Sequence, residues 1–140
     1  MGIHGEGGAV YSAGTLFCYD CNFENNYANG GGGAIYALAQ NSTISSSKFI
    51  NNTASENGGA VYVPQNNTKV MNNNFTNNSA LNGGAIYVGA SNVVITKNNF
   101  TNNSAERGGA IYTSNKVIGG SISSSYFNQN RADYGGAIYA

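Results

Sequence analysis

A five-residue motif, Gly-Gly-Ala-(Val/Ile)-Tyr, recurs at almost constant spacing along the whole sequence. Successive copies are separated by 25, 26, 25, 25 and 27 residues. The six copies begin at Gly7, Gly32, Gly58, Gly83, Gly108 and Gly135. A period of this length that covers the chain is typical of repeat architectures, in which each unit packs mainly against its neighbours.

A second motif, Phe-x-x-Asn-x-Ala, lies between successive copies of the first. Its five copies begin at Phe23, Phe49, Phe75, Phe100 and Phe127. The residue five positions before each Phe is apolar, or Cys: Cys18, Ile44, Val70, Ile95 and Ile122. The residue two positions before each Phe is small or polar: Cys21, Ser47, Asn73, Asn98 and Ser125. Eleven motif copies in strict alternation therefore define five periods.

Each period offers three short extended segments rather than a helix. Helical repeats need longer amphipathic stretches, and Gly-Gly pairs and Asn/Ser clusters interrupt every such stretch here. Three strands and three turns make one coil of a parallel β-helix, whose coils stack about 4.8 Å apart. Left-handed versions use shorter coils, which favours the right-handed form. We predict an all-β, right-handed parallel β-helix of about five coils of 25–27 residues with three short strands per coil, in which residues 1–140 form one domain without obvious end caps.

Stacking places equivalent residues of successive coils directly above one another, so each column should keep one residue type. We expect the Phe column and the Cys18/Ile44 column to lie inside, and the Gly-Gly pairs to form tight corners. A third inward column should consist of Val10, Ile35, Val61, Ile86, Ile111 and Ile138. We also expect an amide ladder at a bend, formed by Asn26, Asn52, Asn78, Asn103 and Asn130.

Charge is scarce and balanced. Six Lys and Arg face six Asp and Glu in 140 residues, so 9% of the chain is charged and the formal net charge is zero. The basic residues are scattered singly, which argues against a nucleic-acid partner or an anionic lipid surface. No apolar run reaches the roughly 18 residues of a membrane helix, so we expect no direct membrane insertion. The 41% of hydrophobic residues and the scarcity of charge also argue against a disordered chain.

The paired motifs Gly-Gly-Ala-(Val/Ile) and Phe-x-x-Asn resemble the repeat of chlamydial polymorphic membrane proteins. Similar repeats occur in adhesin-like surface proteins of some archaea and protists. The resemblance covers nearly the whole chain, and it implies a right-handed β-helix displayed at a cell surface, mostly for adhesion. Extracellular or cell-surface localisation is therefore what the resemblance implies. The residues Met1–His4 themselves show no secretion signal.

Many right-handed β-helices are polysaccharide lyases or hydrolases, which need two or three converging carboxylates. We expect the acids here to fall at different points of the coil, with Glu106 and Asp133 closest to a shared position and no two in one column of adjacent coils. The six acids are Glu6, Asp20, Glu24, Glu56, Glu106 and Asp133. We therefore predict no catalytic residues and no enzyme, and keep a polysaccharide-active enzyme as the weakest alternative.

Cys18 and Cys21 have the spacing of half a zinc site, but His4 is the one histidine of the chain. Both cysteines occupy columns that Ile, Val, Ser and Asn fill elsewhere, which favours buried structural thiols over a disulfide or metal. We predict no metal and no cofactor.

Asn-x-Ser/Thr sequons would mark outward turns if the chain were glycosylated, and they begin at Asn41, Asn51, Asn66, Asn74, Asn77, Asn99 and Asn102.

The tyrosine that follows each Val or Ile of the first motif should point outward. This stripe consists of Tyr11, Tyr36, Tyr62, Tyr87, Tyr112 and Tyr139. It is a candidate contact surface for sugars or another protein, although mutual stacking that stabilises the outer face is the preferred interpretation.

Two functional hypotheses follow. The first is a non-catalytic structural or adhesive β-helix module of a surface or extracellular protein, either within a longer parent array or in contact with a host or cell-surface glycan or protein. The second is a filament subunit that stacks on copies of itself through uncapped ends.

Overall fold

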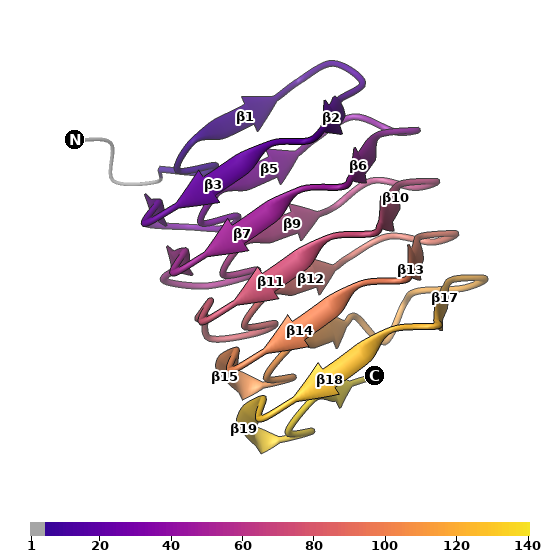
Figure 1. The fold of residues 1–140 in the computed structure, drawn as a ribbon. Coiled ribbons are helices and arrows are strands. Elements are labelled where there is room, and N and C mark those ends of the chain that lie inside the picture. The colour runs from indigo at the N-terminus through magenta and orange to yellow at the C-terminus, as the bar shows by residue number, and fades with distance from the viewer. Residues whose placement is uncertain (1–4) are drawn as a thin grey trace.

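The structure is a computed structural model that describes residues 5–140, and every regular element within them is a short β-strand. The strands stack in parallel and in register from coil to coil (Figure 1). Counted from each Gly-Gly-Ala motif, coils 1 to 5 are residues 7–31, 32–57, 58–82, 83–107 and 108–134. The predicted all-β solenoid of about five coils, with three principal strands per coil, is confirmed.

Three parallel sheets form the sides of the coils. Sheet A contains β1 (Val10–Ser12), β5 (Ile35–Ala37), β9 (Val61–Val63), β12 (Ile86–Val88), β16 (Ile111–Thr113) and β20 (Ile138–Tyr139). Sheet B contains β2 (Phe17–Tyr19), β6 (Thr43–Ser45), β10 (Lys69–Met71), β13 (Val94–Thr96) and β17 (Ser121–Ser123). Sheet C contains β3 (Asn22–Glu24), β7 (Lys48–Ile50), β11 (Asn74–Thr76), β14 (Asn99–Thr101) and β18 (Tyr126–Asn128).

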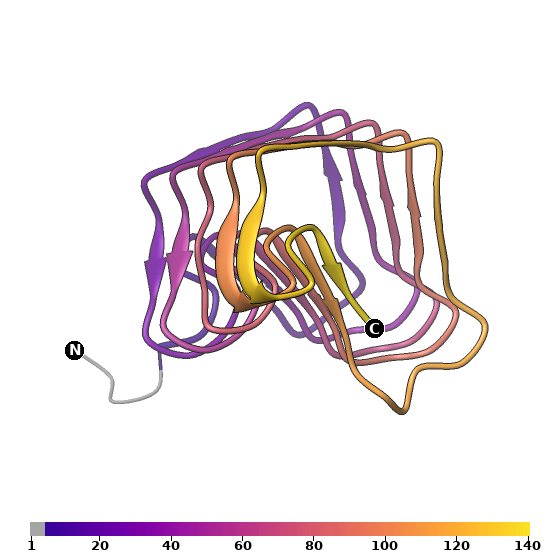
Figure 2. The same cartoon turned by 90° about the horizontal axis from the view of Figure 1, so that it is seen from below.

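A fourth short segment in each coil was not predicted. It pairs as strands at both ends of the stack and as isolated bridges between them, and we call it segment D. Its strands are β4 (Tyr27–Ala28), β8 (Thr53–Ala54), β15 (Ser104–Arg107) and β19 (Arg131–Tyr134). Viewed along the stack, the chain curls back between sheet C and the next strand of sheet A (Figure 2).

The interior consists of the predicted columns. Ile35, Val61, Ile86 and Ile111 are fully buried, whereas Ile138 in the last strand is 36% exposed because no further coil covers it in the described structure. Neighbouring rings of the Phe column are nearly parallel, with centroids 4.7–5.1 Å apart. The alternation of inward and outward residues along each strand is what the pleat requires.

The predicted amide ladder is present and lies inside the helix. Asn78 shows the pattern: its Nδ2 donates to Phe49 O and to Asn103 Oδ1, both at 3.0 Å. Its Oδ1 accepts hydrogen bonds from the backbone N and the Nδ2 of Asn52, again at 3.0 Å. Because Asn52, Asn78 and Asn103 are fully buried, these bonds satisfy polar groups that water does not reach.

A second polar ladder lies at the corner between sheets B and C. Asn73 donates from its backbone N and from Nδ2 to Asn98 Oδ1, and Ser47 donates from its backbone N to Asn73 Oδ1. At both corners the residue just before the ladder position has a left-handed backbone, with φ of 57° at Asn72 and at Asn77. Asparagine tolerates this conformation better than most residues, so an Asn-Asn pair places one residue on the bend and one inside.

The two glycines of the repeated motif meet different requirements. Gly83 has a φ of 68°, where a Cβ would lie 2.2 Å from the carbonyl oxygen of Ile86. A Cβ on Gly84 would lie 2.1 Å from the carbonyl oxygen of Gly109 in the next coil. The first glycine therefore permits the turn, and the second permits the close stacking of coils.

Within residues 5–140 there is no helix with the length and apolarity that a membrane-spanning segment requires.

Replacing Asn78 by Ala tests the ladder. It leaves Asn52 N and Phe49 O without their partners inside the coil, so we expect a loss of about 3–5 kcal/mol in the free energy of unfolding. Asn99→Ala is the matched control, because Asn99 is exposed and its substitution should change stability by less than about 0.5 kcal/mol. Urea unfolding followed by circular dichroism measures both. Equal losses in the two variants would contradict the structural role of the ladder.

Candidate functional site

The six tyrosines of the predicted stripe stack on the outer face of sheet A. Adjacent ring centroids are 4.7–5.3 Å apart, and the angle between ring planes ranges from 4° to 53°. The four central rings (Tyr36, Tyr62, Tyr87 and Tyr112) are half-buried, while Tyr11 is 53% exposed. The stripe is thus a stacked column that is only partly open to solvent.

Segment D and the turn that follows it cover one side of this column. A Cβ on Gly31 would lie 3.1 Å from Cγ of Tyr62, so the backbone before the Gly-Gly-Ala turn packs directly on that ring. The curl in Figure 2 brings this turn beside sheet A. The geometry agrees with mutual stacking as the stripe's main role and leaves its use as a contact surface a prediction.

The stacked phenols are harder to ionise than free tyrosine. Burial raises the pKa of Tyr36 to about 12, and Tyr62 and the carboxylate of Glu6 act in the same direction. Burial also raises the pKa of Tyr62 and, with help from the neighbouring tyrosines, that of Tyr87. A negative charge on one ring of the column would face the next ring at close range.

This gives an alkaline prediction. The pKa of tyrosine is 10 in the unfolded chain and is raised to about 12 for Tyr36 in the fold, so the contribution of Tyr36 to stability is complete below pH 10 and is lost as the pH rises toward 12. We expect the melting temperature to fall across this interval and Tyr36→Phe to make the fall shallower. Tyr19→Phe, at a 73% exposed position, is the control. A melting temperature that is flat from pH 10 to 12, or equal slopes in both variants, contradicts the assignment.

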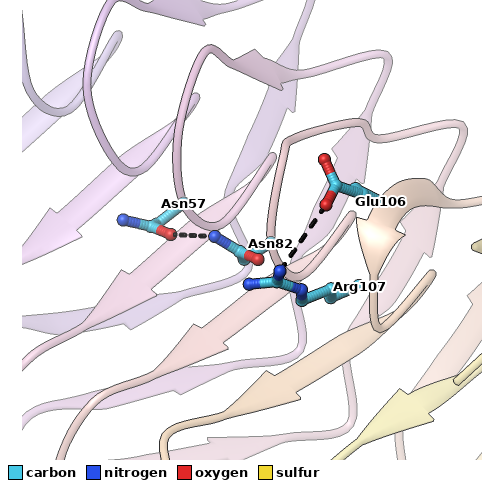
Figure 3. Close-up of polar contacts among 4 residues, drawn as sticks. All are labelled: Asn57, Asn82, Glu106 and Arg107. Carbon is cyan, nitrogen blue, oxygen red and sulfur yellow. Dashed lines mark hydrogen bonds and ion pairs between the residues drawn. The ribbon is translucent and has the colours of Figure 1, made fainter. Parts of the chain in front are cut away.

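The expectation that no two acids share a column was wrong. Ala105 pairs with Ala132 and Arg107 with Tyr134, so Glu106 and Asp133 lie opposite each other on the adjacent strands β15 and β19. Each acid directly follows the Ala of its copy of the second motif, so counting from that Ala places both in one column. Both carboxylates are exposed, and Glu106 forms an ion pair with the neighbouring Arg107 at 3.7 Å (Figure 3).

Beside these acids lies a short polar row that the motifs did not reveal. Asn82 Nδ2 donates to Asn57 Oδ1 at 3.0 Å, and Arg107 follows in register one coil further along (Figure 3). Gly31 occupies the same column one coil earlier. Residue types therefore change along this column, whereas each interior column keeps one type. Hydrogen bonding within the row and the Glu106 ion pair account for its polar contacts.

Cys18 is the central residue of β2 and Cys21 lies at the corner between sheets B and C in coil 1, and both are free thiols. Cys18 is buried as predicted and Cys21 is half-buried. Burial raises the pKa of Cys18 to about 12, with a contribution in the same direction from Cys21. Within residues 5–140 no group of three or more His, Cys, Asp and Glu residues could hold a metal ion, and His4 lies outside the described residues.

Six of the seven sequon asparagines are exposed, and Asn74 is half-buried. Asn51, Asn77 and Asn102 occupy one left-handed bend in successive coils, whereas Asn74 and Asn99 lie on strands β11 and β14. The outward-turn interpretation therefore fits the bend residues but not Asn74 or Asn99. Glycosylation itself stays a prediction.

A shallow, open groove of about 680 Å³ follows the corner between sheets B and C over coils 2 to 5. One bank is the bend column, Ser46, Asn72, Lys97 and Ser124, and the other bank is the first outward column of sheet C, Lys48, Asn74, Asn99 and Tyr126. Beneath them lies the second polar ladder of Ser47, Asn73, Asn98 and Ser125. No acidic residue lines the groove. We call this feature the B–C groove.

A family model described as "Right handed beta helix region" matches residues 1–140. The chain belongs to the right-handed β-helix family. Comparison with curated proteins found no match, and comparison with solved structures found none either. This family includes both enzymes and proteins without catalytic activity, so membership establishes the fold and leaves the activity open.

Sequence reasoning missed the B–C groove in this β-helix because its lysines are far apart in the chain. Lys48 and Lys97 are separated by almost two periods, and they occupy different columns. The repeat period could have revealed the groove, because counting each residue from the nearest Phe places both lysines at the same corner. Composition could not show this, because it averages over all faces of the coil.

Proposed function

We propose that the chain is a non-catalytic structural or adhesive module of a surface or extracellular protein, of the kind that carries the chlamydial polymorphic membrane protein-type repeat. The observation that supports this is the contrast between inner and outer columns. On sheet B the inward column is apolar throughout, apart from Cys18, whereas the outward column is Phe17, Thr43, Lys69, Val94 and Ser121. A uniform interior with a varied exterior suits a scaffold that displays side chains.

The ladders make this scaffold a rod. Backbone bonds, Phe rings and amides all run along the same axis, so five coils extend about 24 Å at about 4.8 Å per coil. The buried asparagines use their hydrogen bonds within the ladders, which leaves the outer columns for contact with a partner. A stalk or an adhesive surface needs this combination of fixed length and variable exterior.

A polysaccharide-cleaving enzyme is the weakest alternative. Its best support is the opposed pair Glu106 and Asp133, with Glu56 in the same segment. General acid catalysis by such a pair normally relies on an environment that separates the two carboxyl pKa values. Here both side chains are exposed, and Glu106 is engaged with Arg107.

End-to-end assembly into filaments is the second candidate, and one observation favours it. Among the described residues, nine of the ten exposed large hydrophobic side chains lie in the first and last coils or just beyond them, and Leu81 is the exception. The nine are Tyr11, Phe17, Tyr19, Tyr27, Ile118, Tyr126, Tyr134, Ile138 and Tyr139. Seamless stacking would require β1 or β20 to leave sheet A, because that sheet has six strands and sheets B and C have five.

Small-angle scattering across a concentration series separates these candidates. The module predicts one maximum dimension at all concentrations, and the filament predicts growth with concentration. Incubation with neutral and acidic polysaccharides, followed by assays for new reducing ends and unsaturated sugars, tests catalysis. Turnover that Glu106→Gln or Asp133→Asn abolishes would overturn the non-catalytic proposal, whereas we expect no product above the level of a heat-denatured control.

A further inference from the structure

Charge is segregated in the fold although it is balanced in the sequence. Lys48, Lys69 and Lys97 lie on the faces and corner of sheets B and C in coils 2 to 4. Glu56, Glu106 and Asp133 are in or beside segment D, together with Arg107 and Arg131, and Glu6 precedes coil 1. Asp20 and Glu24 lie on the B–C side but in coil 1, where Asp20 continues the bend column one coil before Ser46. The B–C side of the middle coils is therefore the basic side of the molecule.

Resting on the proposed adhesive function, we propose that the B–C groove binds a linear anionic polysaccharide that runs along the axis of the helix. Lys48 stands on one bank in coil 2 and Lys97 on the opposite bank in coil 4. Two coils separate them, which is about 10 Å along the axis. A polymer with anionic groups at intervals would meet one ammonium group on each side in turn.

The remaining lining suits sugar hydroxyl groups. Asn72 and Asn99 present exposed carboxamides, which donate and accept hydrogen bonds, and Ser46 and Ser124 present exposed hydroxyls. Asn74 lies between Lys48 and Asn99 on the same bank, but its Oδ1 is shielded from solvent, so the carboxamides available to a sugar are those of Asn72 and Asn99. Tyr126 is 63% exposed at one end of the groove, where its ring offers an apolar face to a pyranose.

A nucleic acid is the less suitable occupant. Single-stranded nucleic acids require a row of aromatic rings for base stacking and a dense basic track for the phosphates. The groove has one exposed ring and two lysines among twelve lining residues. Spaced charges with many neutral polar groups match a polysaccharide that carries carboxylate, sulfate or phosphate on some of its sugars.

The repeat supplies substitutions that preserve the fold. Lys97→Asn introduces the residue that Asn72 provides at the same left-handed bend, and Lys48→Asn introduces the residue found in the same column at Asn22, Asn74 and Asn99. The control pair Lys69→Thr and Lys116→Asn removes the same charge outside the groove, since neither lysine lines it. Thr43 already occupies the Lys69 column.

The test is a binding titration of the whole chain with dextran sulfate, polygalacturonate, a phosphorylated mannan and uncharged dextran. We expect binding to at least one charged polymer and none to dextran, with affinity falling as ionic strength rises. Lys48→Asn/Lys97→Asn should weaken binding about five- to tenfold at low ionic strength, and the control pair less than about twofold. The charged polymer that binds identifies the anionic group.

Three results would overturn the proposal: no binding to any charged polymer, equal weakening by the two double variants, or equally tight binding of oligo(dT). If binding is absent while scattering still shows rods of one length and no turnover occurs, the groove assignment fails and the proposed function stands. If a bound polymer is cleaved, the proposed function fails as well. Circular dichroism of each variant shows that loss of binding is not loss of fold.

Discussion

The structure depends on in-register hydrogen bonding between successive coils. Each strand is only two to four residues long, and it pairs with the equivalent strand 25–27 residues away rather than with a neighbour in sequence. Such short strands have no independent stability. The register therefore determines which side chains are buried, because a slip of one residue would turn every inward side chain of that strand outward. The uniform columns are what hold the register.

The polar columns explain an unusual composition. Asparagine serves in this chain in two ways, as a left-handed bend residue and as a buried rung, and the pairs Asn51-Asn52 and Asn77-Asn78 show both roles side by side. The glycine pairs combine one left-handed turn residue with one point of close contact between coils. Low charge follows from the same geometry, since like charges directly opposite on paired strands are destabilising. The few charged residues lie on the outside, where the columns vary.

The motifs predicted the parts of the structure that repeat. The three principal strands, the Phe and Ile columns and the ladder at Asn78 all follow from spacing, because stacking converts a period into a column. Segment D was missed because its one repeated apolar residue is the Ala of the second motif, and a single Ala beside Thr53, Ser79 or Ser104 does not identify a strand. The pairing of Glu106 with Asp133 could have been predicted from the second motif, because each acid directly follows the Ala of its copy. The B–C groove was missed because its residues differ from coil to coil, and only their three-dimensional positions bring Lys48 and Lys97 together.

Deletion of one complete coil tests the central claim most directly. Asn74 pairs with Asn99 and Phe75 with Phe100, so removing residues 75–99 joins Asn74 to Phe100 in register. We predict a folded β-helix that is shorter by about 4.8 Å and less stable, because one inter-coil interface is gone. Removing residues 75–86 alone breaks the period and should prevent folding. Scattering and urea unfolding measure both deletions, and a 75–99 deletion that unfolds like the half-coil deletion, or that matches the parent in stability, would contradict the account.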